Sequence, residues 1–312
     1  MISLKQASLC VLTLISVPCL ASANESVECL KVNIGDGGWT DNQAQNGFAA
    51  VVLRKLGYKP VTTLLSIGVM MQGMKRGDVD VFMGQWSPNG DAVSQPYLDS
   101  GVMRKISTNL TGAKYSLAVP AYTYAEGLQT VQDIARWKDK LGGKIYALEP
   151  GNDSNIVLEK IRQEGSLGLK DFNIVASSEH AMLSAVDKAV KAKRPIVFIG
   201  WAPHPMNTKF NMKYLSGGDQ WFGPNYGSAT VWTGMRPAYA DKCPNVTNFF
   251  QNLVFTTDLL GGAMTKIAEG TPADQVAQAY LKANPAVLDN WLEGVKTASG
   301  GDGLPTVQAA LK

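Results

Sequence analysis

Short hydrophobic runs with strand-like composition alternate along this chain with amphipathic segments that have helical spacing. The first part of the chain predicts strands at residues 29–35, 60–65 and 79–83, and helices at residues 41–56 and 67–76. This alternation is typical of parallel sheets whose faces are covered by helices. We therefore expect an α/β fold.

The alternation continues through a second group of segments and then changes character. This second group predicts strands at residues 114–119, 144–148, 172–176 and 196–199, and helices at residues 131–141, 154–164 and directly after Ser177-Ser178. Beyond about residue 209, we expect a loop at residues 215–226, which are rich in Gly, Asp and Asn, then a strand at 229–233 and three helices after Pro244.

The length of 312 residues exceeds what a single hydrophobic core usually serves, so two domains are expected. No low-complexity linker separates them, which indicates that the chain crosses between the domains more than once. We predict crossings near residues 111–115 and 205–213. One domain would then contain residues 27–113 plus 209–312 and the other residues 114–208, with a hinge that allows closure around a ligand.

The first 23 residues have the pattern of a cleavable signal peptide. Lys5 is followed by a largely apolar stretch from Leu9 to Leu20, and Ala21-Ser22-Ala23 matches the small-x-small cleavage pattern. The apolar stretch is shorter than the ~20 residues that a permanent membrane helix needs. The cleavage pattern disfavours the alternative, a cytosolic protein with a hydrophobic first helix. We expect export, cleavage before Asn24, and a soluble mature protein.

Removal of residues 1–23 would leave two cysteines, Cys29 and Cys243. In an oxidising compartment two cysteines favour a disulfide. The alternatives are two free buried thiols or half of a metal site. A metal site is disfavoured because the two histidines, His180 and His204, have no partner at ligand spacing.

Four aromatic residues, Trp39, Trp86, Tyr115 and Trp201, lie within or directly after strand-like runs. In open α/β sheets ligands bind beyond the carboxyl ends of strands, so side chains placed there converge on one crevice. Converging aromatic faces suit a cation that has no N–H group, such as a quaternary ammonium. The alternative for each ring is packing in the core, where large aromatic side chains are common.

Two polar residues, Asp41 and Asn152, lie between a predicted strand and a predicted helix. Both could be helix N-caps, because Asp and Asn are preferred there. The alternative is that they face the aromatic crevice and bind the polar end of the ligand. His204, in Ala202-Pro203-His204-Pro205, is interpreted as a structural histidine near the hinge.

Features of enzymes and of nucleic-acid-binding proteins are missing from the sequence. Gly-x-Ser-x-Gly, the Walker motif and the Rossmann glycine pattern do not occur, and no nucleophile–base arrangement stands out. A net charge of +3 without a dense basic cluster does not indicate a surface that binds nucleic acid or an anionic membrane. We expect no catalytic residue, no cofactor and no nucleic-acid partner.

Six short motifs together resemble the glycine betaine/choline substrate-binding proteins of ABC importers, most closely their choline-binding branch. They are Gly38-Trp39-Thr40-Asp41, Asp80-Val81-Phe82-Met83-Gly84-Gln85-Trp86, Gly112-Ala113-Lys114-Tyr115, Glu149-Pro150-Gly151-Asn152-Asp153, Gly200-Trp201-Ala202-Pro203-His204-Pro205-Met206 and Tyr214-Leu215-Ser216-Gly217-Gly218-Asp219. The sequence departs from the family pattern at Gln85-Trp86-Ser87-Pro88, where Asn and Met are expected around the tryptophan.

The resemblance implies a type II-like periplasmic-binding-protein clamp, with a helix-covered sheet in each domain and a ligand cleft between them. It implies an aromatic box around a trimethylammonium group, formed by Trp39, Trp86, Tyr115 and Trp201. Asp41 and Asn152 would hold the choline hydroxyl.

The expected function is therefore that of a periplasmic, monomeric binding protein that delivers choline to the ABC permease subunits of the inner membrane. One alternative is a glycine betaine or carnitine binding protein, although Asp41 would repel the carboxylate of either ligand. Another alternative is a secreted choline-ester hydrolase, for which the sequence offers no visible nucleophile.

Overall fold

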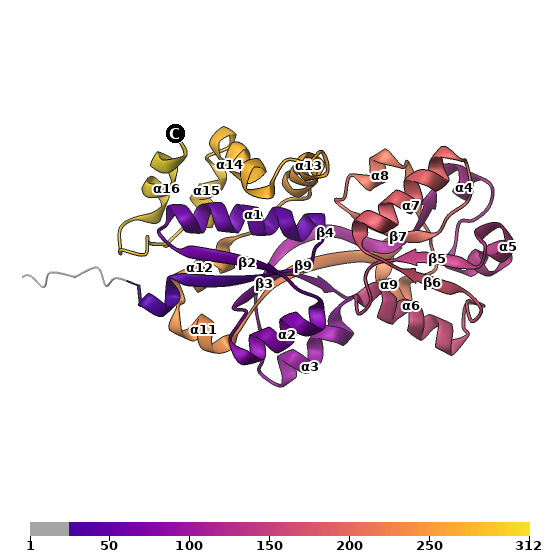
Figure 1. Cartoon of the computed structure of the whole chain (residues 1–312), viewed down its shortest axis with the longest axis horizontal. Coiled ribbons are helices and arrows are strands. Elements are labelled where there is room, and N and C mark those ends of the chain that lie inside the picture. Colours follow the sequence, from indigo (N-terminus) through magenta and orange to yellow (C-terminus); the bar gives the residue numbers. More distant parts are fainter. Residues whose placement is uncertain (1–24) are drawn as a thin grey trace, which may run out of the picture.

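A mixed sheet of nine strands is the framework of residues 25–312, the part of the chain that this computed structural model describes (Figure 1). The predicted signal peptide and the predicted start at Asn24 lie outside the described residues. The strands follow the order β2-β1-β3-β9-β4-β7-β5-β6, and β8 pairs with β4. They are β1 Lys31–Asp36, β2 Lys59–Leu64, β3 Val81–Ser87, β4 Arg104–Pro120, β5 Lys144–Ala147, β6 Asn173–Ala176, β7 Phe198–Ala202, β8 Met212–Tyr214 and β9 Ser228–Met235.

Helices cover the faces of this sheet. The α-helices are α1 Thr40–Lys55, α2 Ile67–Arg76, α3 Asp91–Asp99, α4 Ala121–Ala125, α5 Lys138–Leu141, α6 Asp153–Glu164, α7 Glu179–Lys191, α8 Met206–Lys209, α9 Asp219–Phe222, α10 Pro224–Gly227, α11 Pro237–Lys242, α12 Pro244–Asn252, α13 Thr257–Ala268, α14 Ala273–Ala283, α15 Val287–Trp291 and α16 Gly303–Leu311. Two 3₁₀ helices are η1 Val27–Cys29 and η2 Val131–Trp137. Within residues 25–312, no helix combines the length and the apolar character that a membrane span requires.

Figure 1 shows the elements gathered in two lobes. In the first lobe β1, β2 and β3 lie between α1, α13 and α14 on one side and α2 and α3 on the other. In the second lobe β5, β6 and β7 lie among α4 to α9. Two long strands, β4 and β9, run from one lobe into the other, since β4 pairs with β9 from Arg104 to Lys114 and with β7 from Lys114 to Ala118.

The division into residues 27–113 plus 209–312 and residues 114–208 stays a prediction. The position of strand β8 is relevant to the second predicted crossing, near residues 205–213. Strand β8, at residues 212–214, pairs with Ala118–Pro120 of β4 and therefore lies beside the elements of the second lobe.

The structure corrects three details of the sequence-based expectation. The sheet is mixed rather than parallel, because β9 is antiparallel to β3 and β4, and β4 is antiparallel to β7. Strand β4 begins at Arg104, ten residues before the predicted strand, since residues 104–109 are too polar to predict a buried strand. The predicted loop at 215–226 contains the short helices α9 and α10, and five helices rather than three follow Cys243.

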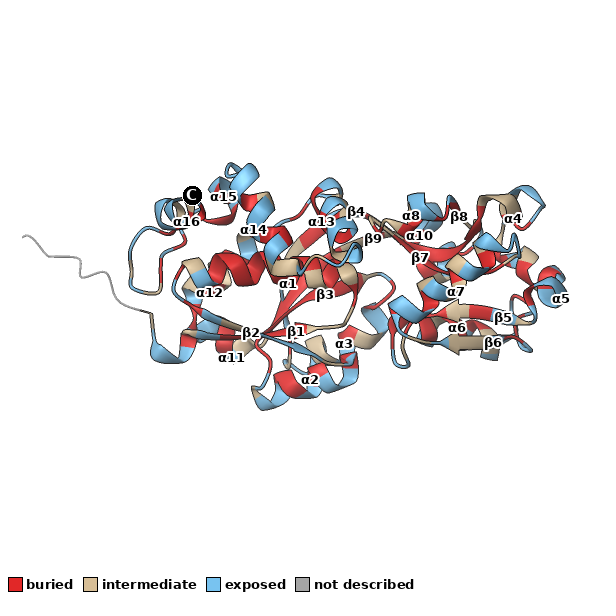
Figure 2. Cartoon of the chain, turned by 45° about the horizontal axis from the view of Figure 1, so that its top comes forward, coloured by how far each residue is buried: buried red, intermediate tan, exposed pale blue. Residues whose placement is uncertain are grey.

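The core lies between the sheet and its helices, as the burial pattern in Figure 2 shows. Strand β3 is buried at every position from Val81 to Trp86. Phe48 of α1 packs edge-on against Trp291 of α15, with ring centroids 5.7 Å apart. The ring of Phe255 packs against both. Each such fully buried ring contributes about 1.5–3 kcal/mol of transfer free energy. Trp291 is a core residue and is 2% exposed.

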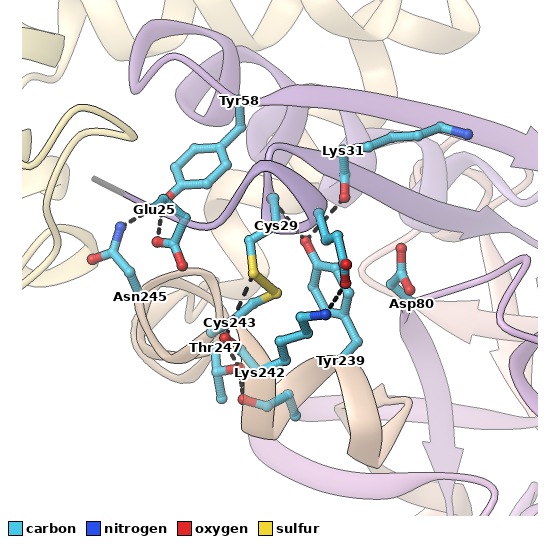
Figure 3. The surroundings of a disulfide bond; sticks show 12 residues. Glu25, Cys29, Lys31, Tyr58, Asp80, Tyr239, Lys242, Cys243, Asn245 and Thr247 are labelled. Atoms are coloured by element: carbon cyan, nitrogen blue, oxygen red, sulfur yellow. Dashed lines mark hydrogen bonds and ion pairs between the residues drawn. A yellow bond between two sulfur atoms is a disulfide. The ribbon is translucent and has the colours of Figure 1, made fainter. Parts of the chain in front are cut away.

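A disulfide between Cys29 and Cys243 ties the start of the first lobe to its C-terminal half (Figure 3). The two Cα atoms are 5.5 Å apart, and both residues are fully buried. Nearby, the Tyr239 hydroxyl donates to the backbone carbonyls of Cys29 and Lys31 at 3.1 Å each. The preferred sequence-based interpretation, a bridge rather than two free thiols, is confirmed.

We predict that thiol labelling of the unfolded, unreduced protein finds no free cysteine. The bridge spans 214 positions of the sequence, so its reduction should lower the free energy of unfolding by about 2 kcal/mol or more. Chemical denaturation with and without reductant measures that loss. The same comparison in a Cys29→Ala/Cys243→Ala variant should show no effect of reductant, and two labelled thiols in the unreduced protein would contradict the prediction.

Candidate functional site

All six predicted site residues line one small interior cavity. The cavity is formed by Trp39, Asp41, Trp86, Tyr115, Asn152 and Trp201, together with Leu148 and Asp153. The four rings are 2–5% exposed, so nearly all of their surface faces the protein interior. The structure therefore brings together residues that are up to 162 positions apart, counted from Trp39 to Trp201.

Sheet register places the aromatic rings on one wall. Tyr115 and Trp201 are direct partners in the antiparallel pair of β4 and β7, so their side chains lie on the same face of the sheet. Trp86 is the next-to-last residue of β3, and its ring centroid is 5.6 Å from that of Tyr115, with the planes tilted by 46°. Trp39 comes from the turn between β1 and α1. Tyr115 lies inside its strand and not at the end, because β4 continues to Pro120.

Asp41 is a buried carboxylate without a full set of partners. It lies in the first turn of α1 and is 2% exposed, and its Oδ2 atom has no hydrogen-bond partner among the described residues. Burial, followed by repulsion from Glu179, raises the pKa of Asp41 to about 7, although hydrogen bonds from the Trp86 side chain and from backbone amides oppose the shift. The helix N-cap is Trp39, so Asp41 is not the N-cap of this helix.

Asn152 is the N-cap of α6 and also lines the cavity, and its role in binding the polar end of a ligand stays a prediction. Its Oδ1 atom accepts hydrogen bonds from the Ser154 amide at 3.0 Å, the Ser154 hydroxyl at 2.8 Å and the Tyr115 hydroxyl at 3.1 Å. Its Nδ2 group donates one hydrogen bond, to Glu149 at 3.0 Å. An amide nitrogen carries two hydrogens, so Asn152 keeps one donor to offer.

Sequence reasoning missed Asp153 and Leu148, which also line the cavity. Asp153 is the first residue of α6, and burial, followed by repulsion from Glu149 and Asp91, raises its pKa to about 7. Asp153 was part of a quoted motif, but its neighbour Asn152 carried the functional interpretation. The available signal was a predicted strand that ends in Leu148 and is followed, after a three-residue turn, by two adjacent polar residues.

A carboxylate of the second lobe, Glu149, contacts a cavity residue of the first lobe, Trp39. The Trp39 indole N–H donates to both oxygens of Glu149, at 3.1 and 3.2 Å. The ring of Trp39 is thereby fixed by a residue 110 positions away in the sequence. Among the described residues, no group of three or more His, Cys, Asp or Glu side chains could hold a metal ion.

Two lobes that share a sheet and enclose an aromatic cavity define the class of protein: a substrate-binding protein with the type II-like periplasmic fold. The chain belongs to the OpuAC family, the substrate-binding domain of ABC-type glycine betaine transport systems, whose sequence model matches residues 31–283. Family members serve transporters as substrate-binding proteins and are not enzymes.

Solved structures and a named relative agree with this assignment. An ABC-transporter choline-binding protein in complex with choline is 45% identical, with a TM-score of 0.90 over 92% of this chain and 100% of that chain. Lactococcal OpuAC, in its closed form with glycine betaine, is 26% identical, with a TM-score of 0.75 over 84% of this chain and 98% of its own. A glycine betaine/carnitine transport binding protein of Listeria monocytogenes is 26% identical over 60% of this chain and 62% of its own length.

Proposed function

We propose that this protein is the periplasmic binding component of an ABC importer and that its ligand is choline, which it delivers to the permease subunits of the inner membrane. The observation that carries the proposal is a buried cavity that combines four aromatic rings with two carboxylates, Asp41 and Asp153. None of the described residues lining it is Lys or Arg. The 45% sequence identity between this chain and a choline-binding protein supports the same ligand.

The rings suit the cationic end of choline. A trimethylammonium group has no N–H to donate, so carboxylate oxygens cannot satisfy it by hydrogen bonds, whereas ring faces attract it through their quadrupoles. Each desolvated cation–π contact is worth up to ~2 kcal/mol. Four such contacts, less the costs of desolvation and closure, support micromolar binding, which needs about 8 kcal/mol.

The polar residues suit the hydroxyl of choline. Asp41 Oδ2 lacks a donor, and Asn152 retains one N–H. A hydroxyl donates one hydrogen and accepts others, so it can satisfy both groups at once. The carboxylate of glycine betaine can accept from Asn152 but cannot donate to Asp41, and its charge is repelled by Asp41 and Asp153.

Titration calorimetry with choline, acetylcholine, glycine betaine and carnitine tests the proposal. Choline should bind with the highest affinity of the four, and tighter binding of glycine betaine than of choline would contradict the ligand assignment. The alternative of a choline-ester hydrolase is tested by incubation with acetylcholine, since release of acetate at a catalytic rate would overturn a binding role.

We predict that choline affinity rises with pH between about 5 and 8. In the closed cavity without ligand the pKa values of Asp41 and Asp153 are about 7, and a cation favours their ionised forms. Below pH 7, choline binding must release the proton of each carboxylate. The choline affinity then falls by about tenfold per pH unit for each proton released. Above both pKa values the dependence should level off.

Calorimetry at several pH values, in buffers with different ionisation enthalpies, measures both the affinity and the number of protons released. Glycine betaine is the control ligand, because ionised aspartates repel its carboxylate and its affinity should gain less from a rise in pH. A choline dissociation constant that stays constant from pH 5 to 8 would refute the role of the carboxylates.

A further inference from the structure

A carboxylate outside the cavity, Glu179, joins the two lobes. It is the first residue of α7 in the second lobe and is 7% exposed. The Thr40 backbone N–H donates to its Oε2 atom at 2.9 Å, and the Thr40 hydroxyl donates to Oε1. Thr40 is the first residue of α1, on the other lobe (Figure 1). A buried carboxylate of one lobe therefore satisfies the N-terminal end of a helix of the other.

The same carboxylate is held from its own lobe by His204. The backbone N–H of Met206 donates to His204 Nδ1 at 2.9 Å, so this nitrogen is an acceptor and the proton of the neutral ring is on Nε2. Nε2 lies 3.1 Å from Glu179 Oε1 and donates to it. Both ring nitrogens are thus satisfied, which agrees with the interpretation of His204 as a structural histidine. Glu179 accepts three hydrogen bonds, two of which come from the opposite lobe.

These contacts join the cavity residues of both lobes without entering the cavity. Thr40 lies between Trp39 and Asp41 in the sequence, and the His204 ring packs edge-on against Trp201 with centroids 4.7 Å apart. Glu179 itself does not line the cavity. Separation of the lobes would break both bonds from Thr40, so they stabilise only the arrangement in which the aromatic rings surround a ligand.

We propose that Glu179 is a positioning residue that stabilises the closed clamp through Thr40, an inference that rests on the proposed function. A residue that acts on closure alone changes the population of the binding-competent form, and the apparent dissociation constant scales with the inverse of that population. Its loss should therefore weaken both choline and glycine betaine. The two factors should be similar at pH 8, where Asp41 is ionised, because at lower pH the loss of Glu179 also removes the repulsion that raises the pKa of Asp41. The cavity residues, in contrast, distinguish between these ligands.

The test is a double-mutant cycle with Thr40→Val and Glu179→Gln, which change one hydroxyl and one charge at nearly constant volume. At pH 8, where Asp41 is ionised in every variant, each single variant should raise the dissociation constants of choline and glycine betaine by about tenfold, mainly through faster dissociation. The double variant should fall well short of the product of the two effects, because both changes weaken the same hydrogen bond between the Thr40 hydroxyl and the Glu179 carboxylate. Thr40→Ser, which keeps the hydroxyl, should remain near wild type.

Matched controls are Thr306→Val, at an exposed position of α16, and Glu164→Gln, at the exposed end of α6, and both should bind as wild type does. Thermal unfolding without ligand shows whether each variant is folded. Wild-type affinity and dissociation rate in Thr40→Val and Glu179→Gln would overturn this inference and leave the proposed function standing, as would fully multiplicative effects. A wild-type protein that binds neither choline nor glycine betaine would overturn the proposed function and this inference with it.

Discussion

Replacing Trp201 by a non-aromatic residue should weaken every trimethylammonium ligand by about 2–4 kcal/mol, on the order of 30- to 1,000-fold in the dissociation constant. This range combines a desolvated cation–π contact of up to ~2 kcal/mol with the lost burial of a large ring against the ligand. Choline, acetylcholine and glycine betaine share the same cationic head, so all three should lose affinity alike. Titration calorimetry with each ligand gives the comparison, and Trp86→Ala should behave in the same way.

Trp201 offers a sharper comparison than Trp86. Its indole nitrogen has no hydrogen-bond partner among the described residues, so Trp201→Phe removes no hydrogen bond and keeps an aromatic face. The Trp86 side chain, by contrast, lowers the pKa of Asp41, so its removal also changes that carboxylate. We expect Trp201→Phe to retain most of the affinity and Trp201→Leu, with similar apolar character but no quadrupole, to lose it. Equal losses in the two variants would show that the ring acts by bulk alone.

Asp41→Asn should shift the preference between choline and glycine betaine by about 10- to 100-fold. The carboxylate attracts the cationic head and can accept the choline hydroxyl, an interaction worth about 1.5–3 kcal/mol when the acceptor is charged. Removing the charge therefore weakens choline. It also removes a repulsion of the glycine betaine carboxylate, whose binding should change little or improve.

The selectivity measurement is best made at pH 8, where Asp41 is ionised, because its pKa is about 7. Asp153→Asn is the companion variant, since Asp153 lines the same cavity with a similarly raised pKa. It should reduce choline affinity through charge alone. If the ratio of choline to glycine betaine affinity is the same in Asp41→Asn as in wild type, our account of selectivity is wrong.

The parts of the site that depend on local sequence could be predicted, and the contacts between distant segments could not. Trp86 and Trp201 end hydrophobic runs, and Asn152 precedes a helical pattern, so their positions in the fold follow from periodicity. The contacts of Glu179 with Thr40 join residues 139 positions apart, and nothing in the neighbourhood of either residue indicates the other.

The sheet shows the same division between local and distant information. Parallel pairing of β1 with β2 and of β5 with β6 follows from the strand–helix alternation. The antiparallel strands β4 and β9 could not be anticipated, because Arg104–Asn109 is too polar to predict a strand and gains its place from pairing with β9. Those two strands are also the elements that carry the chain from one lobe to the other.

The raised pKa values of the two carboxylates also affect closure of the lobes in the ligand-free protein. Closing the lobes over Asp41 and Asp153 without a cation forces both into a buried setting where their charges are unfavourable, so each must take up a proton or the lobes must stay apart. At neutral pH and above, the empty protein is therefore expected to resist closure. If the permease responds only to the closed form, the charge of the cavity would prevent the transporter from hydrolysing ATP when no ligand is bound.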